Sequence, residues 1–146
     1  MSEKCMSAAE LKRRNDPKGY CPLESDEQQA LFSWTRLMEG KHPELKLLYA
    51  IPNGGLRNMP EAVRFTKEGV RRGVPDMCLP VARGKYHGLY IELKRIRGGK
   101  VSPEQEEWIE RLNRQGYRAA VCRGFDEAKK TIEEYMKMGK KGGEVV

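Results

Sequence analysis

The first part of the chain with a regular hydrophobic pattern begins near Ser25. Leu31, Trp34 and Met38 follow one another at the three- and four-residue spacing of a helix face. An S-x-x-Q capping-box pattern starts at Ser25, and Gly40 ends the hydrophobic pattern. These features predict a helix between Ser25 and Gly40.

Further segments carry strand or helix signals, so the chain is expected to alternate between the two. In order, they are a strand at 45–51, a helix at 58–68, the two strands of a hairpin at 77–82 and 88–93, a helix from Ser102 to Gly116, a strand at 118–122 and a helix capped by Asp126. This order predicts an α/β fold, with a mixed β-sheet covered by helices. One domain is expected at 24–138, between an irregular leader at 1–23 and a disordered tail at 139–146.

The positive charge of the chain is concentrated in one segment. The net charge is +7, and the stretch from Arg57 to Lys100 holds eleven basic but only four acidic residues. A local excess of this kind predicts a surface that binds a polyanion, whereas a basic surface that serves solubility alone would spread the charge more evenly.

Several classes of protein are disfavoured by composition. No stretch approaches the roughly 18 consecutive apolar residues of a membrane-spanning helix. The N-terminal residues lack the apolar run of a secretory signal, so a cytoplasmic location is expected. The four cysteines (Cys5, Cys21, Cys78 and Cys122) share no close spacing, which argues against a zinc site.

The predicted hairpin brings three charged residues to one face of the sheet. A turn centred near residue 85 would place Asp76 opposite Lys94 and Cys78 opposite Glu92. Because strand side chains alternate with a period of two, Asp76, Glu92 and Lys94 are all expected on the same face. A register slip of one residue would destroy this arrangement.

Two carboxylates and an ammonium group at one point indicate metal-dependent phosphodiester chemistry. Buried carboxylates repel each other unless a cation lies between them. Mg²⁺ takes one or two carboxylate ligands, keeps positions for water and phosphate, and activates the water, while Lys94 would orient the water or stabilise the transition state. Taken singly, Asp76 could be a turn residue, and Glu92 and Lys94 a solvated strand face. Because all three residues are expected on one face, a metal-dependent active site is favoured over these separate explanations.

Two helix residues are expected to join this centre. Glu27 precedes Leu31 by four positions and therefore lies on the inward stripe of the first helix, where it could supply a third metal oxygen. Gln105 precedes Trp108 by three positions, which places it on the sheet-facing side of its own helix. Gln105 has an alternative explanation as the capping-box partner of Ser102.

At this point the chain resembles the VRR-NUC branch of the PD-(D/E)XK nucleases. The residues that carry the resemblance are GVRRGVPD at 69–76, IELK at 91–94 and SPEQ at 102–105. The resemblance covers roughly 24–138 and includes the IPNGG turn at 51–55. A lone D…ExK pattern is weak evidence, but VRRG before Pro-Asp, followed by correctly spaced ExK and S-P-x-Q, is specific.

The resemblance implies a restriction-endonuclease-like fold, dependence on Mg²⁺ or Mn²⁺, and DNA cleavage without a small-molecule cofactor. It implies that Asp76 and Glu92 are metal ligands, Lys94 the catalytic lysine, Gln105 the active-site glutamine and Glu27 the helix-borne acid. Free-standing members of this size look like phage or prophage proteins. Some favour branched DNA, such as Holliday junctions or flaps, and often act as homodimers.

A further set of residues is expected to contact DNA. Its members are Asn53, Arg71, Arg72, Lys94, Arg95, Arg97 and Lys100. The run from Lys94 to Lys100 places four cations among glycines, which suits phosphate contact, with a solvated basic loop as the alternative. Asn53 could face the substrate or belong only to a tight turn.

Three functions follow from these observations, and the sequence favours the first. It is a structure-selective, metal-dependent DNA endonuclease, since no base-reading motif such as a zinc finger is present. The second is a DNA-junction-binding module that has the nuclease fold without cutting. The third is a nuclease that acts on RNA.

Overall fold

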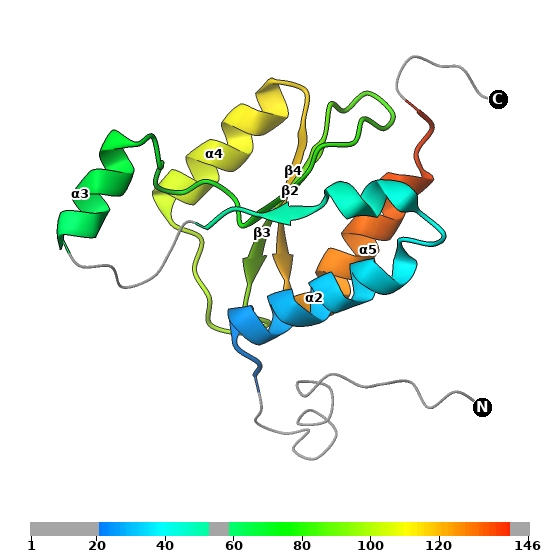
Figure 1. Cartoon of the computed structure of the whole chain (residues 1–146), viewed down its shortest axis with the longest axis horizontal. Coiled ribbons are helices and arrows are strands. Elements are labelled where there is room, and N and C mark those ends of the chain that lie inside the picture. Colours follow the sequence, from blue (N-terminus) through cyan, green and yellow to red (C-terminus); the bar gives the residue numbers. More distant parts are fainter. Residues whose placement is uncertain (1–20, 53–58, 141–146) are drawn as a thin grey trace.

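The computed structural model describes residues 21–52 and 59–140, and its elements follow the predicted order. They are α2 (Glu24–Met38), the 3₁₀ helix η1 (Pro43–Leu47), β1 (Tyr49–Ala50), α3 (Met59–Lys67), β2 (Met77–Leu79), β3 (Leu89–Lys94), α4 (Pro103–Arg114), β4 (Arg118–Arg123) and α5 (Gly124–Lys137). The predicted α/β fold is therefore confirmed (Figure 1). None of the helices in these ranges is long and apolar enough to cross a membrane.

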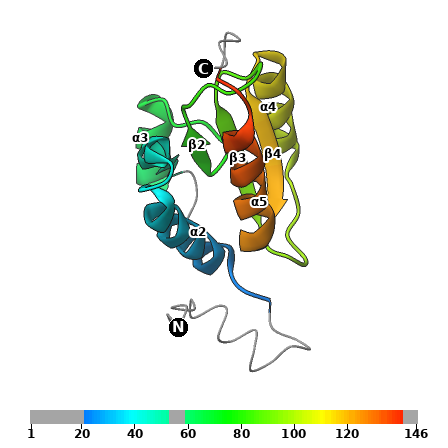
Figure 2. The same ribbon diagram turned by 90° about the vertical axis from the view of Figure 1, so that its right-hand side faces the viewer.

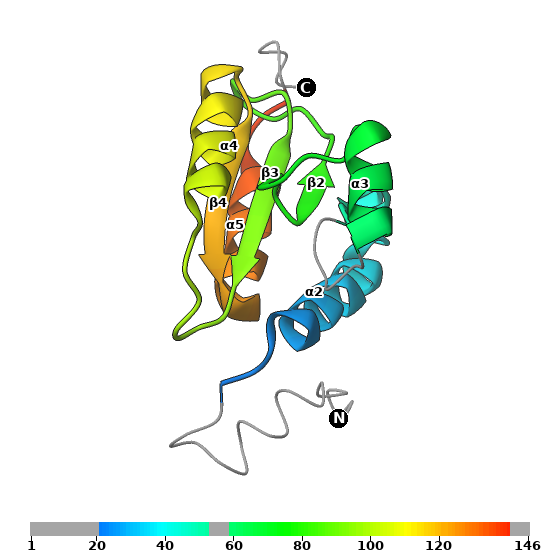
Figure 3. The same ribbon diagram turned by 90° about the vertical axis from the view of Figure 1, so that its left-hand side faces the viewer.

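The described strands form one mixed sheet in the order β1-β2-β3-β4. β1, β2 and β3 pair antiparallel, whereas β3 and β4 run parallel and are connected through α4. α4 covers one face of the sheet, and α2 and α5 lie on the other (Figures 2 and 3). β3 lies inside the sheet and carries the ExK residues.

The hydrophobic core lies between the sheet and the α2–α5 pair. Leu31 of α2, Leu93 of β3 and Ile132 of α5 are each 0% exposed. Tyr135 of α5 is also buried, and its hydroxyl donates a hydrogen bond to the carbonyl of Val81 after β2. The core thus fixes β2 and β3 as a rigid base for side chains on the opposite face.

The strand predicted at 45–51 is wrong in its first half. Pro43–Leu47 forms η1, and only Tyr49–Ala50 is extended. Pro43 occupies the first position of η1, where its missing N–H costs nothing. Leu45 and Leu48 are both buried at a spacing of three, which suits a 3₁₀ turn and not the alternation of a strand.

The predicted caps of α2 and α5 are also wrong. α2 begins at Glu24, with Leu23 as its cap, so Ser25 lies inside the helix and makes no capping box. α5 begins at Gly124, so Asp126 lies in the first turn and does not cap it. In both helices acidic residues lie in the first turn, where the helix dipole stabilises them, and the N-cap residue itself makes no side-chain hydrogen bond.

Most of the predicted leader and tail lies outside the described residues. Residues 1–20 and 141–146 lie outside the described residues, and 21–23 form neither helix nor strand. Gly139 and Lys140, the first two residues of the predicted tail, contact the hairpin loop, and the disorder of the tail stays a prediction. Gly84 of the hairpin loop donates its N–H to the carbonyl of Gly139 at 2.6 Å, and Arg83 forms a β-bridge with Lys140.

Candidate active site

The predicted hairpin is present, but its register lies two residues from the predicted one. Cys78 pairs with Tyr90 instead of Glu92. The connection begins with Pro80, which cannot donate to the ladder, and the N–H of Val81 turns back to the carbonyl of Leu79 at 2.8 Å. The strands therefore stop pairing at Leu79 and Leu89. The prediction assumed that they pair continuously up to a turn near residue 85.

A shift of two residues leaves every side chain on its predicted face, because strand side chains alternate with a period of two. Asp76 immediately precedes β2, and Glu92 and Lys94 lie in β3. Glu92 is 2% exposed and Lys94 is 7% exposed, so this charged pair is buried under the α4 side of the sheet. The structure thus brings the three predicted residues together.

Among the buried oxygens of the two carboxylates, one has no hydrogen-bond partner within the described residues. Asp76 Oδ2 accepts a hydrogen bond from the backbone N–H of Leu93 at 2.7 Å. Glu92 Oε1 accepts one from Gln105 Nε2 at 2.8 Å and lies 3.2 Å from Lys94 Nζ. Glu92 Oε2 is buried and has no hydrogen-bond partner within the described residues. A bare buried carboxylate oxygen is costly, and a bound cation would satisfy it.

Gln105 completes the predicted capping box, and its side chain also reaches Glu92. Its N–H donates to Ser102 Oγ at 3.2 Å, and its Oε1 accepts from the Ser102 N–H at 2.9 Å, which completes the predicted capping box of α4. The Nε2 group of the same side chain is then directed at Glu92. Helix capping therefore fixes the amide orientation that holds the carboxylate.

Burial raises the pKa of both carboxyl groups, and the charge of Asp76 raises that of Glu92 further. The pKa of Glu92 is raised to about 7, first by burial and then by the charge of Asp76, against the lowering effect of Lys94. The pKa of Asp76 is also raised, first by burial, although the hydrogen bond from Leu93 opposes this. The charge of Glu24 on α2 raises both values further.

These pKa shifts predict that the metal-free fold loses stability as the pH rises. Between its ordinary pKa of 4.5 and about 7, Glu92 keeps a proton when folded that the unfolded chain releases. Above this window Glu92 is charged in the folded state as well, and its burial lowers the free energy of unfolding. We expect Glu92→Gln to stabilise the metal-free protein at pH 8 on the order of 2 kcal/mol and to leave it nearly unchanged at pH 4. Thermal melts in EDTA at both pH values check this, and equal gains at both would contradict it.

Glu27 is buried as predicted, with 1% exposure, but its carboxylate lies at the start of α5. Glu27 Oε2 accepts a hydrogen bond from the backbone N–H of Phe125 at 2.6 Å. A helix N-terminus presents unpaired N–H groups and favours negative charge. Glu27 therefore supplies the side-chain acceptor expected from Asp126, and its role as a metal ligand stays a prediction.

The acid of α2 that faces the centre is Glu24. It lines a cavity of about 380 Å³ together with Asp76 and Pro52, and its charge acts on both carboxyl groups. The sequence did contain the signal, because Glu24 precedes Leu31 by seven positions and so shares its helix face. Across residues 21–52 and 59–140, no group of three or more His, Cys, Asp or Glu side chains is arranged to hold a metal ion.

Replacing Glu24 and Glu27 by alanine is expected to have different effects on stability. Glu27→Ala leaves the buried Phe125 N–H unpaired, so we expect a loss of roughly 1–3 kcal/mol in unfolding free energy. Glu24→Ala should leave stability within about 0.5 kcal/mol of wild type, since Glu24 is only half-buried. Urea titrations of both variants measure this, and equal losses would argue against the assignment of the cap to Glu27.

The residues expected to contact DNA fall into different environments. The guanidinium of Arg95 donates to the carbonyls of Cys21 at 2.9 Å and Pro22 at 3.3 Å, so it anchors the chain before α2. Arg97 and Lys100 are exposed in the following loop. Asn53 lies outside the described residues. Two guanidinium nitrogens of Arg95 are thus engaged by backbone carbonyls, and its phosphate contact stays a prediction.

Arg71 and Arg72 lie beside α4 and line a cavity of about 500 Å³ with Trp108. Trp108 Nε1 donates a hydrogen bond to the carbonyl of Arg72 at 2.9 Å. Gly73 allows this approach, because its φ is 89° and a Cβ there would come within 2.7 Å of the Glu104 backbone. The VRRG segment is thus held against the start of α4, next to Gln105.

Comparison with known proteins agrees with this geometry. The family model described as "VRR-NUC domain" matches residues 8–126. A solved structure titled "VRR_NUC domain protein" is similar to this chain, with 32% sequence identity and a TM-score of 0.73. The similarity covers 83% of this chain and 93% of that one. A search of curated proteins returned no match.

Proposed function

Because the chain belongs to the VRR-NUC family, and is thus a nuclease-type DNA-processing domain, we propose that it is a Mg²⁺- or Mn²⁺-dependent DNA endonuclease. The observation that carries the proposal is the buried Oε2 of Glu92, which has no hydrogen-bond partner in the described structure. The charge of Asp76 also acts on this carboxylate and raises its pKa. A divalent cation would relieve both the unpaired oxygen and the repulsion.

The donor set fits a hard divalent cation. Asp76 and Glu92 would hold the ion, and two carboxylates suffice for Mg²⁺, which keeps several water or phosphate ligands. When bound, the ion lowers the pKa of a coordinated water and neutralises charge on the phosphate. Glu24, which lines the cavity beside Asp76, is near enough to influence this site through its charge.

The other side chains position the reacting groups. Lys94 is buried beside Glu92, so its ammonium group is held in place, and we assign it to orienting the attacking water and stabilising charge on the phosphate. Gln105 and Lys94 both engage Oε1 of Glu92, which leaves Oε2 as the oxygen directed to the metal. The N–H of Leu93 fixes the carboxylate of Asp76.

The proposed substrate is branched DNA, such as a Holliday junction or a flap. Arg71, Arg72, Arg97 and Lys100 are exposed cations that can reach phosphates, which position a duplex without reading its sequence. Selectivity would then come from the shape of the DNA. Homodimer assembly and a phage or prophage origin stay predictions from the family resemblance.

Labelled four-way junction, flap and linear duplex DNA, each incubated with Mg²⁺, Mn²⁺ or EDTA, test the proposed function. We expect cleavage only with metal, and faster cleavage of the branched substrates. RNA of the same shape, supplied as a competitor and as a labelled substrate, separates a ribonuclease from a deoxyribonuclease. Tight binding without product under either metal would instead indicate a junction-binding module.

A further inference from the structure

Two neighbouring cavities form one groove that leads away from Asp76. The first, of about 380 Å³, is lined by Asp76 and Glu24. The second, of about 410 Å³, is lined by Phe32. Gln28 and Gln29 line both cavities, so the two adjoin along α2, and we treat them as one groove. The groove therefore starts at the proposed active site and runs away from it.

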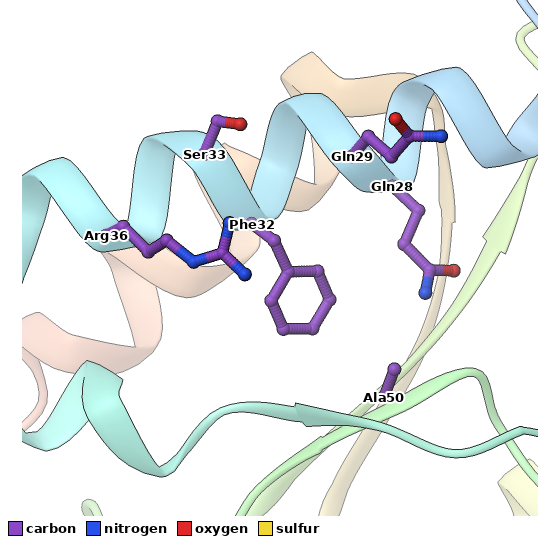
Figure 4. Close-up of a pocket in the computed structure, with 6 residues that line it drawn as sticks. All are labelled: Gln28, Gln29, Phe32, Ser33, Arg36 and Ala50. Carbon is purple, nitrogen blue, oxygen red and sulfur yellow. The ribbon is translucent and has the colours of Figure 1, made fainter.

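One wall of the groove is formed by α2, and four of its lining side chains form a row along the helix. Glu24, Gln28, Phe32 and Arg36 follow one another every four residues, which places them on one helix face. At the rise of an α-helix the row is roughly 18 Å long. Figure 4 shows Gln28 and Phe32 extending toward β1, where Ala50 lines the opposite side, and Arg36 running along α2 toward Phe32.

The chemistry of this row suits one DNA strand. Beyond Glu24, the row holds an amide, an aromatic ring and a guanidinium group, and none of the residues that line the second cavity is acidic. An amide donates to phosphates or base edges, and an arginine pairs with a phosphate. Phe32 is half-buried, so it packs on the core with one part of its ring and leaves another part in the groove.

The aromatic ring favours an unpaired strand over a duplex. Bases stack on accessible aromatic side chains when their faces are free, and this occurs without sequence preference. In a duplex, neighbouring base pairs already cover those faces. A groove with a ring in its middle and a cation at its far end therefore fits a strand that has left the helix, such as the arm of a flap.

We propose that the groove between α2 and β1 binds a single-stranded DNA segment adjacent to the scissile phosphate, with Phe32 as its stacking residue and Arg36 as its phosphate contact. The inference rests on the proposed nuclease function for the identity of the ligand. It adds to that function the reason why a substrate with an unpaired arm is preferred.

Binding in EDTA tests the groove without requiring cleavage. The probes are a fluorescein-labelled oligothymidylate and a labelled blunt hairpin duplex, followed by fluorescence anisotropy. Phe32→Leu keeps the apolar packing but removes the ring, and we expect it to weaken oligothymidylate binding about tenfold and duplex binding less than about twofold. Phe32→Tyr keeps the ring and should bind like wild type.

A second variant does not disturb the core. Arg36 is exposed, so Arg36→Gln should fold normally, weaken oligothymidylate binding and reduce the slope of affinity against salt by about one phosphate contact. Leu37→Ala is the matched control, since Leu37 is 82% exposed on the same helix and does not line the groove. It should leave both affinities unchanged.

The inference is overturned if wild type does not bind oligothymidylate, if Arg36→Gln binds it as wild type does, or if Phe32→Leu weakens both probes equally. Loss of the single-strand preference in the two groove variants supports it. The proposed nuclease function is tested separately. If the protein binds single strands through this groove but cuts no DNA with any metal, the groove assignment stands and the nuclease proposal fails.

Discussion

Asp76→Asn is expected to lower DNA cleavage at least roughly 1000-fold, because it removes one of the two carboxylates assigned to the metal. The replacement is nearly isosteric, and its amide oxygen can still accept the 2.7 Å hydrogen bond that Leu93 donates to Asp76. The fold should therefore survive. The variant should also lose Mn²⁺ affinity, which calorimetric titration of Mn²⁺ into the metal-free protein measures directly.

Asp126→Asn is the matched control for this substitution. Asp126 is exposed in the first turn of α5, away from the proposed metal ligands, so its replacement should change neither Mn²⁺ affinity nor cleavage. If Asp76→Asn binds Mn²⁺ as tightly as wild type, Asp76 is not a ligand, even if cleavage is lost.

The second large effect is expected from Lys94→Met, which should reduce kcat about 100- to 1000-fold. Methionine fills the space of the aliphatic stem but lacks the ammonium group that lies 3.2 Å from Glu92 Oε1. Because Lys94 lowers the pKa of Glu92, its loss should raise that pKa further. The rate should therefore fall most at acidic pH. DNA affinity should change little, since Lys94 is 7% exposed.

Single-turnover cleavage across a pH series measures this effect. Lys46→Met serves as the control, because Lys46 is an exposed lysine of η1 and should retain wild-type rates. A loss of DNA binding in Lys94→Met that accounts for the whole reduction in rate would show that Lys94 is only a phosphate anchor.

The sheet face of the site was predictable from sequence because it depends on parity and not on exact register. The hairpin pairs Cys78 with Tyr90 instead of Glu92, yet Asp76, Glu92 and Lys94 share a face in either arrangement. The capping box at Ser102 was equally local and is confirmed. Features that depend on neighbours in sequence, or on a period of two, survive an error in the turn.

The helix-borne acid was not predictable in the same way. Glu24 and Glu27 both lie on the inward side of α2, and the hydrophobic pattern alone cannot say which one meets the sheet end and which one meets α5. That choice depends on where α5 begins, almost a hundred residues further along the chain. The same long-range packing explains the wrong cap at Asp126, because the Phe125 N–H is satisfied by Glu27 from another helix.

The decisive measurement for the proposed nuclease centre is cleavage of a labelled flap DNA. It compares the wild-type protein in Mg²⁺ with the wild-type protein in EDTA and with Asp76→Ala in Mg²⁺. We expect product only for wild type with Mg²⁺, and equal DNA binding in all three reactions. Product in EDTA, or undiminished product from Asp76→Ala, would contradict the assignment of Asp76, Glu92 and Lys94 as a metal-dependent nuclease centre.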